Sequence, residues 1–304
     1  MKTEQICLER CIGQIVRVIL ENHVPSEPRR QAIRARLAAL YEQADFSRTP
    51  SILSREVFRI LTDELGIADL YQEVKAKSIA LAWQLYDRIQ PCLASHPDPF
   101  SAIVHLVIGA NAIDYGTNPY LTLEEAERLV LASFDEPLDP DAVGKLKQRM
   151  DEAEQILYIM DNCGESVFDR LLLERYAGKI TVAVRGCPVL NDVTRSEVRS
   201  SGLDVYRIVD TGDYAAGVCL EFCSREFLDA YRAADLVVAK GMGNFESLEG
   251  MGVRNTAFLF RAKCPVVEKM LGVEHLSLQL IHQDAEPCKK NAFSGVYELD
   301  GQKK

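Results

Sequence analysis

The residues with the clearest chemical potential lie at the end of a short apolar run, in YIMDNCGESVFDR, residues 158–170. Asp161, Asn162 and Glu165 follow the run within five positions, and a helical pattern begins there. Two carboxylates and an amide supply the hard oxygen ligands that Mg²⁺ and Mn²⁺ prefer. The tetrapeptide DNCG is equally typical of a turn in which Asx side chains bond their own backbone. This stretch alone therefore leaves a metal site and a simple turn open.

Similar apolar runs recur through the second half of the chain, and polar residues follow each of them. The runs predict strands at 156–160, 180–184, 203–209, 236–239 and 257–260. Residues that follow them are Asp161, Asn162 and Glu165; Arg185, Asn191 and Asp192; Asp210, Thr211 and Asp213; Lys240 and Asn244; and Arg261 and Lys263. Because these runs are continuously apolar rather than alternating, we expect strands covered on both faces.

The segments between the runs are long enough for crossover helices, so the pattern predicts a mostly parallel three-layer α/β/α sandwich, Rossmann-like in type. Such sheets bind ligands at the carboxyl ends of their strands. Carboxylates, lysine and arginine should therefore meet at one edge, which favours metal-assisted phosphate chemistry. Taken singly, Asp192 could instead cap a following helix, and KGMGNFESL (240–248) could be a glycine turn with a solvated Lys240.

The first half of the chain has helical spacing throughout. Val57, Ile60 and Leu61 belong to one apolar stripe, which Gly66 closes. Thr122 and Glu125 have capping-box spacing before another stripe. We therefore predict an all-helical domain at 1–150 and an α/β domain, binding metal and phosphate, at 151–304.

Composition limits the possible partners and location. The chain has 304 residues and a formal net charge of −10, which argues against nucleic acid as a partner. No signal peptide pattern and no run of about 18 apolar residues occurs, so no membrane association is expected. Nine scattered cysteines favour reduced thiols and a cytoplasmic location. Cys7 and Cys11 would share a helix face, and a buried structural pair is favoured over a metal site.

Several common catalytic motifs are absent from the sequence. GMGNFE (241–246) has Glu246 where a dinucleotide loop would have its third glycine, and no GxxxxGK[ST] loop occurs. Cys163 lies seven residues before Arg170, one too many for the loop of cysteine phosphatases. DNCG lacks the second aspartate of the haloacid-dehalogenase motif. None of the five histidines has the spacing of a metal-ligand motif.

Four motifs, taken in order, resemble a known family. They are GANAIDYG (109–116), DNCGE (161–165), RGCPVLNDVT (185–194) and KGMGNFESL (240–248). The sequence is similar to the damage-control phosphatases, once catalogued as a domain of unknown function numbered eighty-nine, and closest to their shorter prokaryotic type. The resemblance implies a metal-dependent phosphatase acting on small phosphorylated metabolites, such as sugar phosphates or damaged phosphate esters.

The resemblance also implies residue roles. Asp161, Asn162 and Asp192 would hold a divalent ion, which could be Mg²⁺, Mn²⁺, Co²⁺ or Ni²⁺. As a mechanistic hypothesis beside the resemblance, Asp161, Asp192 and Glu165 are the catalytic candidates, with Asp161 as nucleophile and Glu165 or Asp192 as base, and attack by water stays open. Predicted substrate contacts are Asn111, Asp114, Arg185, Lys240, Asn244 and Glu246. Relatives often begin with a CxxC pair, whereas Cys7 and Cys11 here are four residues apart, so no role is carried over to them.

Two other functions are compatible with parts of this pattern. A methyltransferase that uses S-adenosylmethionine shares the α/β sandwich, but DNCGE stands where its glycine loop would follow the first strand. A non-catalytic protein that binds a phosphorylated metabolite would keep the pocket without turnover. Oligomeric state leaves no signal in the sequence.

Overall fold

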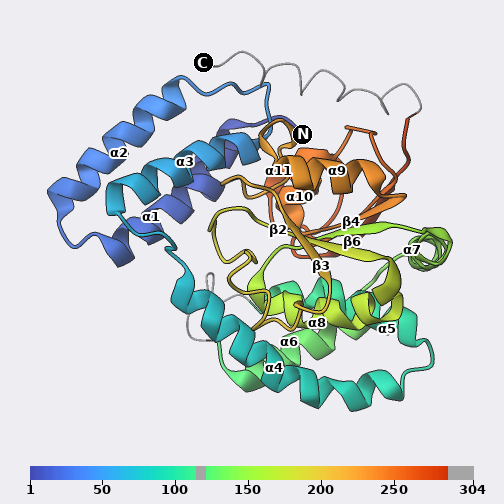
Figure 1. Ribbon diagram of the computed structural model, residues 1–304. Helices are drawn as coiled ribbons and strands as arrows, with labels where there is room; N and C mark the ends of the chain where they lie inside the picture. Colours follow the sequence, from blue (N-terminus) through green and yellow to red (C-terminus); the bar gives the residue numbers. More distant parts are fainter. Residues whose placement is uncertain (114–120, 287–304) are drawn as a thin grey trace.

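The computed structural model describes residues 1–113 and 121–286 (Figure 1). A six-stranded sheet in the order β3-β2-β1-β4-β5-β6 forms its centre. All neighbours pair in parallel except β5 and β6, which are antiparallel. The strands are β1 (Ile156–Ile159), β2 (Ile180–Val184), β3 (Arg207–Asp210), β4 (Leu236–Lys240), β5 (Thr256–Arg261) and β6 (Leu278–Gln283). The predicted mostly parallel sheet is confirmed.

One predicted strand is too long, and one strand was not predicted. The strand predicted at 203–209 begins only at Arg207. Leu203 is buried, but it lies between two turns, and its backbone N–H donates to the Val198 carbonyl at 2.8 Å. Its apolar side chain was mistaken for that of a strand residue because both are buried. The sixth strand, β6, was missed. Its sequence alternates and only its inward side chains are buried, as expected of an edge strand with one covered face.

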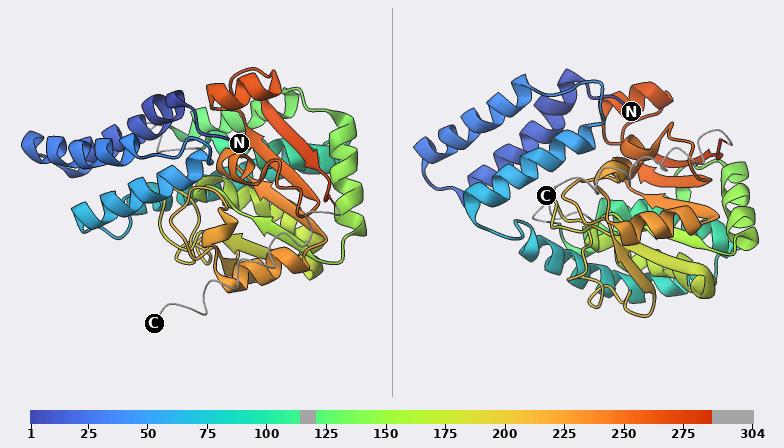
Figure 2. Two further views of the ribbon diagram at one scale, coloured as in Figure 1. Left: turned by 90° about the horizontal axis from the view of Figure 1, so that it is seen from above. Right: turned by 45° about the horizontal axis from the view of Figure 1, so that its top comes forward.

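Helices cover both faces of the sheet, which makes three layers (Figures 1 and 2). Alternate residues of one strand enter different cores: Tyr158 packs with the helices of residues 79–173, whereas Leu157 and Ile159 pack with α9, α10 and α11. The helices are α1 (Gly13–His23), α2 (Glu27–Glu42), α3 (Pro50–Leu65), α4 (Gln72–Ala94), α5 (Pro99–Gly109), α6 (Leu123–Ala132), α7 (Pro140–Glu152), α8 (Cys163–Leu173), α9 (Arg225–Ala233), α10 (Met242–Leu248) and α11 (Pro265–Leu271). The predicted three-layer sandwich is therefore confirmed.

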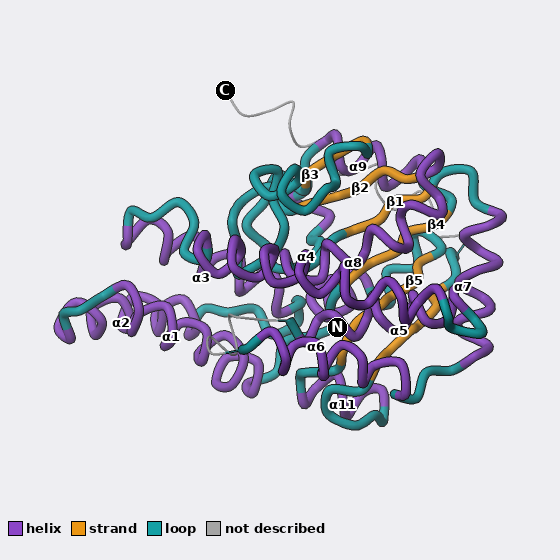
Figure 3. The backbone as a smooth tube through the Cα atoms, turned by 90° about the horizontal axis from the view of Figure 1, so that it is seen from below, coloured by secondary structure: helices purple, strands orange, loops and turns teal. Residues whose placement is uncertain are grey.

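The helical first half of the chain divides between two places. Helices α4 to α7 share a continuous core with the sheet. Helices α1 to α3 extend to one side as an arm with its own apolar core, and Val189 from the loop after β2 joins that core (Figure 3). The predicted capping box of Thr122 and the left-handed Gly66 at the end of α3 are both present. The domain boundary near residue 150 stays a prediction.

One turn of π-helix, Cys7–Ile12, opens the arm before α1. Four short 3₁₀ segments complete the described helical structure: Ala110–Ala112, Ser133–Asp135, Glu174–Lys179 and Leu220–Phe222. Within the part of the chain that the structure describes, no helix has both the length and the apolar composition needed to span a membrane.

Candidate active site

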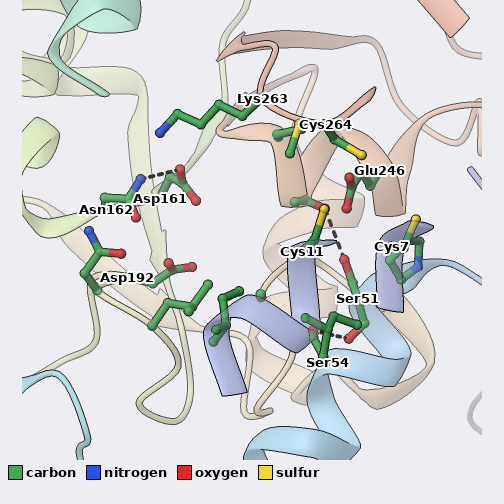
Figure 4. A pocket seen from close by; sticks show the side chains of 18 of the residues that line it. Cys7, Cys11, Ser51, Ser54, Asp161, Asn162, Asp192, Glu246, Lys263 and Cys264 are labelled. Carbon is green, nitrogen blue, oxygen red and sulfur yellow. Dashed lines mark hydrogen bonds between the residues drawn. The ribbon is translucent and has the colours of Figure 1, made fainter. Parts of the chain in front are cut away.

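A cavity of about 300 Å³ lies where the arm meets the carboxyl ends of the strands. One side carries carboxylates and amides, and the other carries thiols, one carboxyl and the hydroxyls of Ser51 and Ser54 (Figure 4). We call the first side the acid wall, made of Asn111, Asp161, Asn162 and Asp192, and the second the thiol wall, made of Cys7, Cys11, Glu246 and Cys264. The arm closes the cavity with apolar side chains, among them Ile12, Ile15, Val57 and Phe58.

Asp161 and Asn162 are placed by the end of β1 and the start of α8. Asn162 is the N-cap of α8, so the turn and the site are one structure. Asp161 Oδ2 accepts hydrogen bonds from Asn162 Nδ2 at 2.7 Å and from Asn111 Nδ2 at 3.4 Å. Gly241, just after β4, has φ 80°, and a Cβ there would collide with the Asp161 carboxylate. A glycine is therefore needed for Asp161 to occupy this position.

Asp192 reaches the same wall from the loop after β2. Its residue pairs with Asn162 in an isolated β-bridge, and the Val193 N–H donates to the Asp161 carbonyl at 2.9 Å. Turns rather than a helix follow Asp192, so the alternative that it caps a helix is wrong. The Asp192 carboxylate instead accepts a hydrogen bond from Arg185 Nε at 2.6 Å.

Behind the acid wall lies a buried network of charges. Lys240 Nζ donates to Glu165 Oε2 and to Asp169 Oδ1, at 2.7 Å each. Burial opposes ionisation of Glu165, but Lys240 and hydrogen bonds from Asn111 and Asn162 outweigh it and lower its pKa. Burial raises the pKa of Asp169 to about 6 in spite of Lys240. Glu165 is thus an ionised group that orients both amides of the acid wall.

The two carboxyls of the acid wall are less fully compensated. Burial, followed by the charges of Asp192 and Glu165, raises the pKa of Asp161 well above its usual value. Burial also raises the pKa of Asp192, although Arg185 partly offsets it. A cation between them would relieve this cost, and two carboxylates with an amide suit a hard divalent ion. Within 1–113 and 121–286, no three His, Cys, Asp and Glu side chains are placed to hold a metal together.

The predicted site residues fall into three groups. Asn111, Asp161, Asn162, Asp192 and Glu246 line the cavity. Glu165, Arg185, Lys240 and Asn244 lie behind its wall: Asn244 accepts from Arg185 at 2.9 Å and donates to the Lys240 carbonyl at 2.6 Å. Asp114 lies outside the described residues. The catalytic, metal and substrate roles of these residues stay predictions.

Several cavity residues were given no role from the sequence, among them Lys263 and Cys264. Lys263 extends toward the acid wall (Figure 4), and its Nζ donates to the Asn111 carbonyl at 3.4 Å. Both residues follow β5, so the position after a strand was an available signal, although for Cys264 the thiol itself gave no hint of a charged site. The apolar residues of the arm gave no signal, because amphipathic spacing does not reveal which surface a helix covers.

The fold and the acid wall together define an α/β protein with an oxygen-rich site at the carboxyl ends of parallel strands. The model of the damage-control phosphatase ARMT1-like domain matches residues 3–278. The chain belongs to this family.

Relatives cover nearly the whole chain. A damage-control phosphatase of Pyrococcus horikoshii is 32% identical over 300 residues, which span 96% of this chain and 99% of the relative. A damage-control phosphatase of Archaeoglobus fulgidus is 30% identical over 88% of this chain and 86% of its own length. The crystal structure of a DUF89 family protein from Pyrococcus horikoshii superimposes with a TM-score of 0.84 at 31% identity, covering 93% of this chain and all of that chain.

Proposed function

We propose that this protein is a metal-dependent phosphatase that hydrolyses small phosphorylated metabolites, either sugar phosphates or damaged phosphate esters. Membership of a damage-control phosphatase family supports the phosphatase activity. The observation that carries the site assignment is that Asp161, Asn162, Asp192 and Lys263, from three separate loops, line one cavity. A cytoplasmic location belongs to the same proposal, because the eight cysteines among the described residues are free thiols.

The acid wall is our proposed metal site. Asp161, Asn162 and Asp192 would hold Mg²⁺, Mn²⁺, Co²⁺ or Ni²⁺, since oxygen-rich sites accept any of these ions according to availability. When bound, the ion would supply positive charge to a phosphate oxygen. Asn111 and Asn162 orient the Asp161 carboxylate through their amide groups. Their own positions depend on Glu165, which accepts from Asn111 Nδ2 at 2.6 Å and from Asn162 Nδ2 at 2.9 Å.

Lys263 is our candidate for contact with the phosphate. Its Nζ has no carboxylate partner among the described residues, and it lies in the cavity wall. Lys240 and Arg185 have their donors engaged by Glu165, Asp169 and Asp192. We therefore assign Lys240 and Arg185 to positioning the acids, and Lys263 to neutralising charge on the transferred phosphoryl group.

Hydrolysis replaces the ester oxygen on phosphorus with an oxygen that ends in inorganic phosphate. Direct attack by Asp161 predicts a phosphorylated aspartate that can be trapped, whereas attack by water predicts ¹⁸O from solvent in phosphate within a single turnover. Either route needs Asp161 at the phosphorus-facing side of the cavity. The assignment of the site is the same whether Asp161 or water attacks the phosphorus.

The test is a substitution at the acid wall. Asp161→Asn removes one negative charge from the metal site while nearly preserving shape, and should lower kcat/KM by about 10³-fold or more. Asp87→Asn, an exposed position on α4, is the matched control and should leave activity unchanged. Assays would use para-nitrophenyl phosphate and a panel of sugar phosphates with each metal added singly. Near-normal turnover of Asp161→Asn at saturating metal would overturn the ligand assignment.

A further inference from the structure

The thiol wall gathers three cysteines at the cavity, and the proposed phosphatase chemistry assigns none of the three a role. Cys7 and Cys11 come from the π-helical turn at the start of the arm, and Cys264 follows β5. Cys7 and Cys264 are 2% and 1% exposed, while Cys11 is partly exposed toward the cavity (Figure 4). Residues 253 positions apart in the sequence thus share one wall of one pocket.

The three cysteines lie close together: all three line the cavity, Cys7 and Cys264 belong to one buried cluster, and Cys11 packs against it (Figure 4). The neighbouring thiols of Cys11 and Cys7 lower the pKa of Cys264. Cys264 and burial raise the pKa of Cys7 and of Cys11. The lowered pKa favours the thiolate form at Cys264, and the thiolate is the form that reacts with oxidants and electrophiles.

The backbone that carries Cys7 and Cys11 is unusual. The Gly13 N–H donates to the Leu8 carbonyl, five residues earlier, which closes the π-helical turn Cys7–Ile12. Such turns are rare and occur frequently at functional sites. Here the turn places Cys7 and Cys11 on the same cavity wall as Cys264. The π-helical turn is a second observation, independent of any pKa, that this cysteine cluster has a functional role.

Glu246 is the fourth member of the thiol wall, and its pKa depends on the charge of Cys264. Its side chain is 8% exposed and makes no hydrogen bond to any residue that the structure describes. Burial, followed by the charge of Cys264, raises the pKa of Glu246 to about 8. Near neutral pH the thiolate thus stands beside a largely protonated carboxyl rather than a second anion.

We propose that Cys264 and Cys11 form a peroxide-sensitive thiol site in the cavity wall, which closes to a disulfide between the π-helical turn Cys7–Ile12 and the residue just before α11. Cys11 is the partner because it is the more exposed of the two cysteines beside Cys264, and both Cys11 and Cys264 line the cavity, through which a small oxidant can reach them. Cys7 stays reduced as a neighbouring thiol. The inference does not depend on the phosphatase proposal.

The chemistry balances with one hydrogen peroxide as the oxidant. The Cys264 thiolate attacks one peroxide oxygen, the O–O bond breaks, and hydroxide leaves, which gives a sulfenic acid on Cys264. The hydroxide takes the Cys11 proton and becomes water. The Cys11 sulfur then attacks the Cys264 sulfur, the S–O bond breaks, and a second hydroxide leaves. Two sulfurs have been oxidised together by two electrons, and the peroxide has been reduced to water and hydroxide.

Peptide mapping tests the pairing directly. Reduced protein would be treated with one equivalent of hydrogen peroxide, blocked with N-ethylmaleimide and digested with trypsin without reduction. Cleavage after Arg10, Arg17, Lys263 and Lys269 places Cys7, Cys11 and Cys264 in three different peptides. The expected product is a linked pair of Cys11–Arg17 and Cys264–Lys269, at least about tenfold more abundant than any linked peptide containing the exposed Cys92.

Two cysteine variants test whether the linked peptide depends on Cys264. Cys264→Ser should abolish the linked peptide, whereas Cys92→Ser, the matched control, should leave it unchanged. Circular dichroism would confirm that each protein is folded before oxidation. Equal alkylation of Cys11 and Cys264 with and without peroxide, in folded protein, would overturn the proposal. So would a linked peptide that appears only after denaturation.

Discussion

The two walls of the cavity each bury a glutamate, and the two glutamates differ in charge. Glu165, behind the acid wall, is 1% exposed and Glu246, in the thiol wall, is 8% exposed. The pKa of Glu165 is lowered because Lys240 and two amides compensate its burial. The pKa of Glu246 is raised to about 8 because burial, followed by the charge of Cys264, outweighs the opposing N-terminal ammonium group. Burial alone therefore does not decide ionisation; the partner supplied by a neighbouring strand does.

The largest effect is expected on stability, when Lys240, the cation behind the acid wall, is replaced. Lys240→Met would leave Glu165 and Asp169 buried without their common partner. Breaking such a group by removing one partner costs about 3–5 kcal/mol in the free energy of unfolding. Urea unfolding measures this loss, and the exposed Lys269→Met is the control. Equal stability of both variants would mean that Lys240 does not compensate these carboxylates.

In the thiol wall, the raised pKa of Glu246 should make the stability of the protein depend on pH. The folded-state pKa of Glu246 lies above its ordinary value of 4.5, so the unfolded chain releases this proton first. As pH rises from about 4.5 to about 8, wild type should lose stability relative to Glu246→Gln, by up to about 1.4 kcal/mol per pH unit. Thermal unfolding of both proteins at pH 5, 6.5 and 8 checks the sign. A constant difference across these pH values would show that Glu246 ionises normally.

A smaller effect is expected from moving the acid wall without changing its charge. Gly241→Ala places a methyl group against the Asp161 carboxylate at a backbone φ of 80°. Displacement of a reacting group by about 1 Å costs on the order of 10²-fold in rate. We expect kcat to fall by that factor. Gly144→Ala, in α7 with open space around it, is the matched control, and activity of Gly241→Ala equal to that control would refute the positioning role.

The smallest effect is expected at Lys263, which lies in the cavity without a carboxylate partner among the described residues. Lys263→Ala should reduce kcat/KM by roughly 10-fold, because one of several charges that act on the phosphate is lost. Metal affinity should be unchanged, since Lys263 touches none of the three proposed ligands. Lys269→Ala again serves as control. A weakened metal affinity with unchanged kcat/KM would move Lys263 out of the phosphate-binding role.

The acid wall could be predicted from sequence because a parallel sheet brings the ends of its strands together. Asp161 and Asp192 are 31 positions apart, yet each follows a strand, and the same rule placed Lys263 at this edge. The thiol wall could not be predicted in this way. Cys7 and Cys11 have apolar neighbours that indicate only a buried helix face, and nothing in helical spacing shows that this face meets the residue after β5.

The fold was predictable to a similar degree and for related physical reasons. Central strands buried on both faces are continuously apolar, so their positions could be recognised. Leu203 was misassigned because a buried turn residue carries the same signal as a strand residue. The edge strand β6 was missed because one face of it is half exposed. How the arm α1–α3 lies against the cavity depends on tertiary contacts such as Val189, which no local pattern encodes.

The most direct test of the central claim is the hydrolysis of para-nitrophenyl phosphate and a panel of sugar phosphates by metal-stripped protein. Mg²⁺, Mn²⁺, Co²⁺ and Ni²⁺ would be added back one at a time, to wild type and to Asp161→Asn. We predict that activity returns to wild type with at least one metal and falls by about 10³-fold or more in the variant. Folded wild-type protein that hydrolyses no ester with any metal would contradict the account and favour a protein that binds phosphorylated metabolites without turning them over.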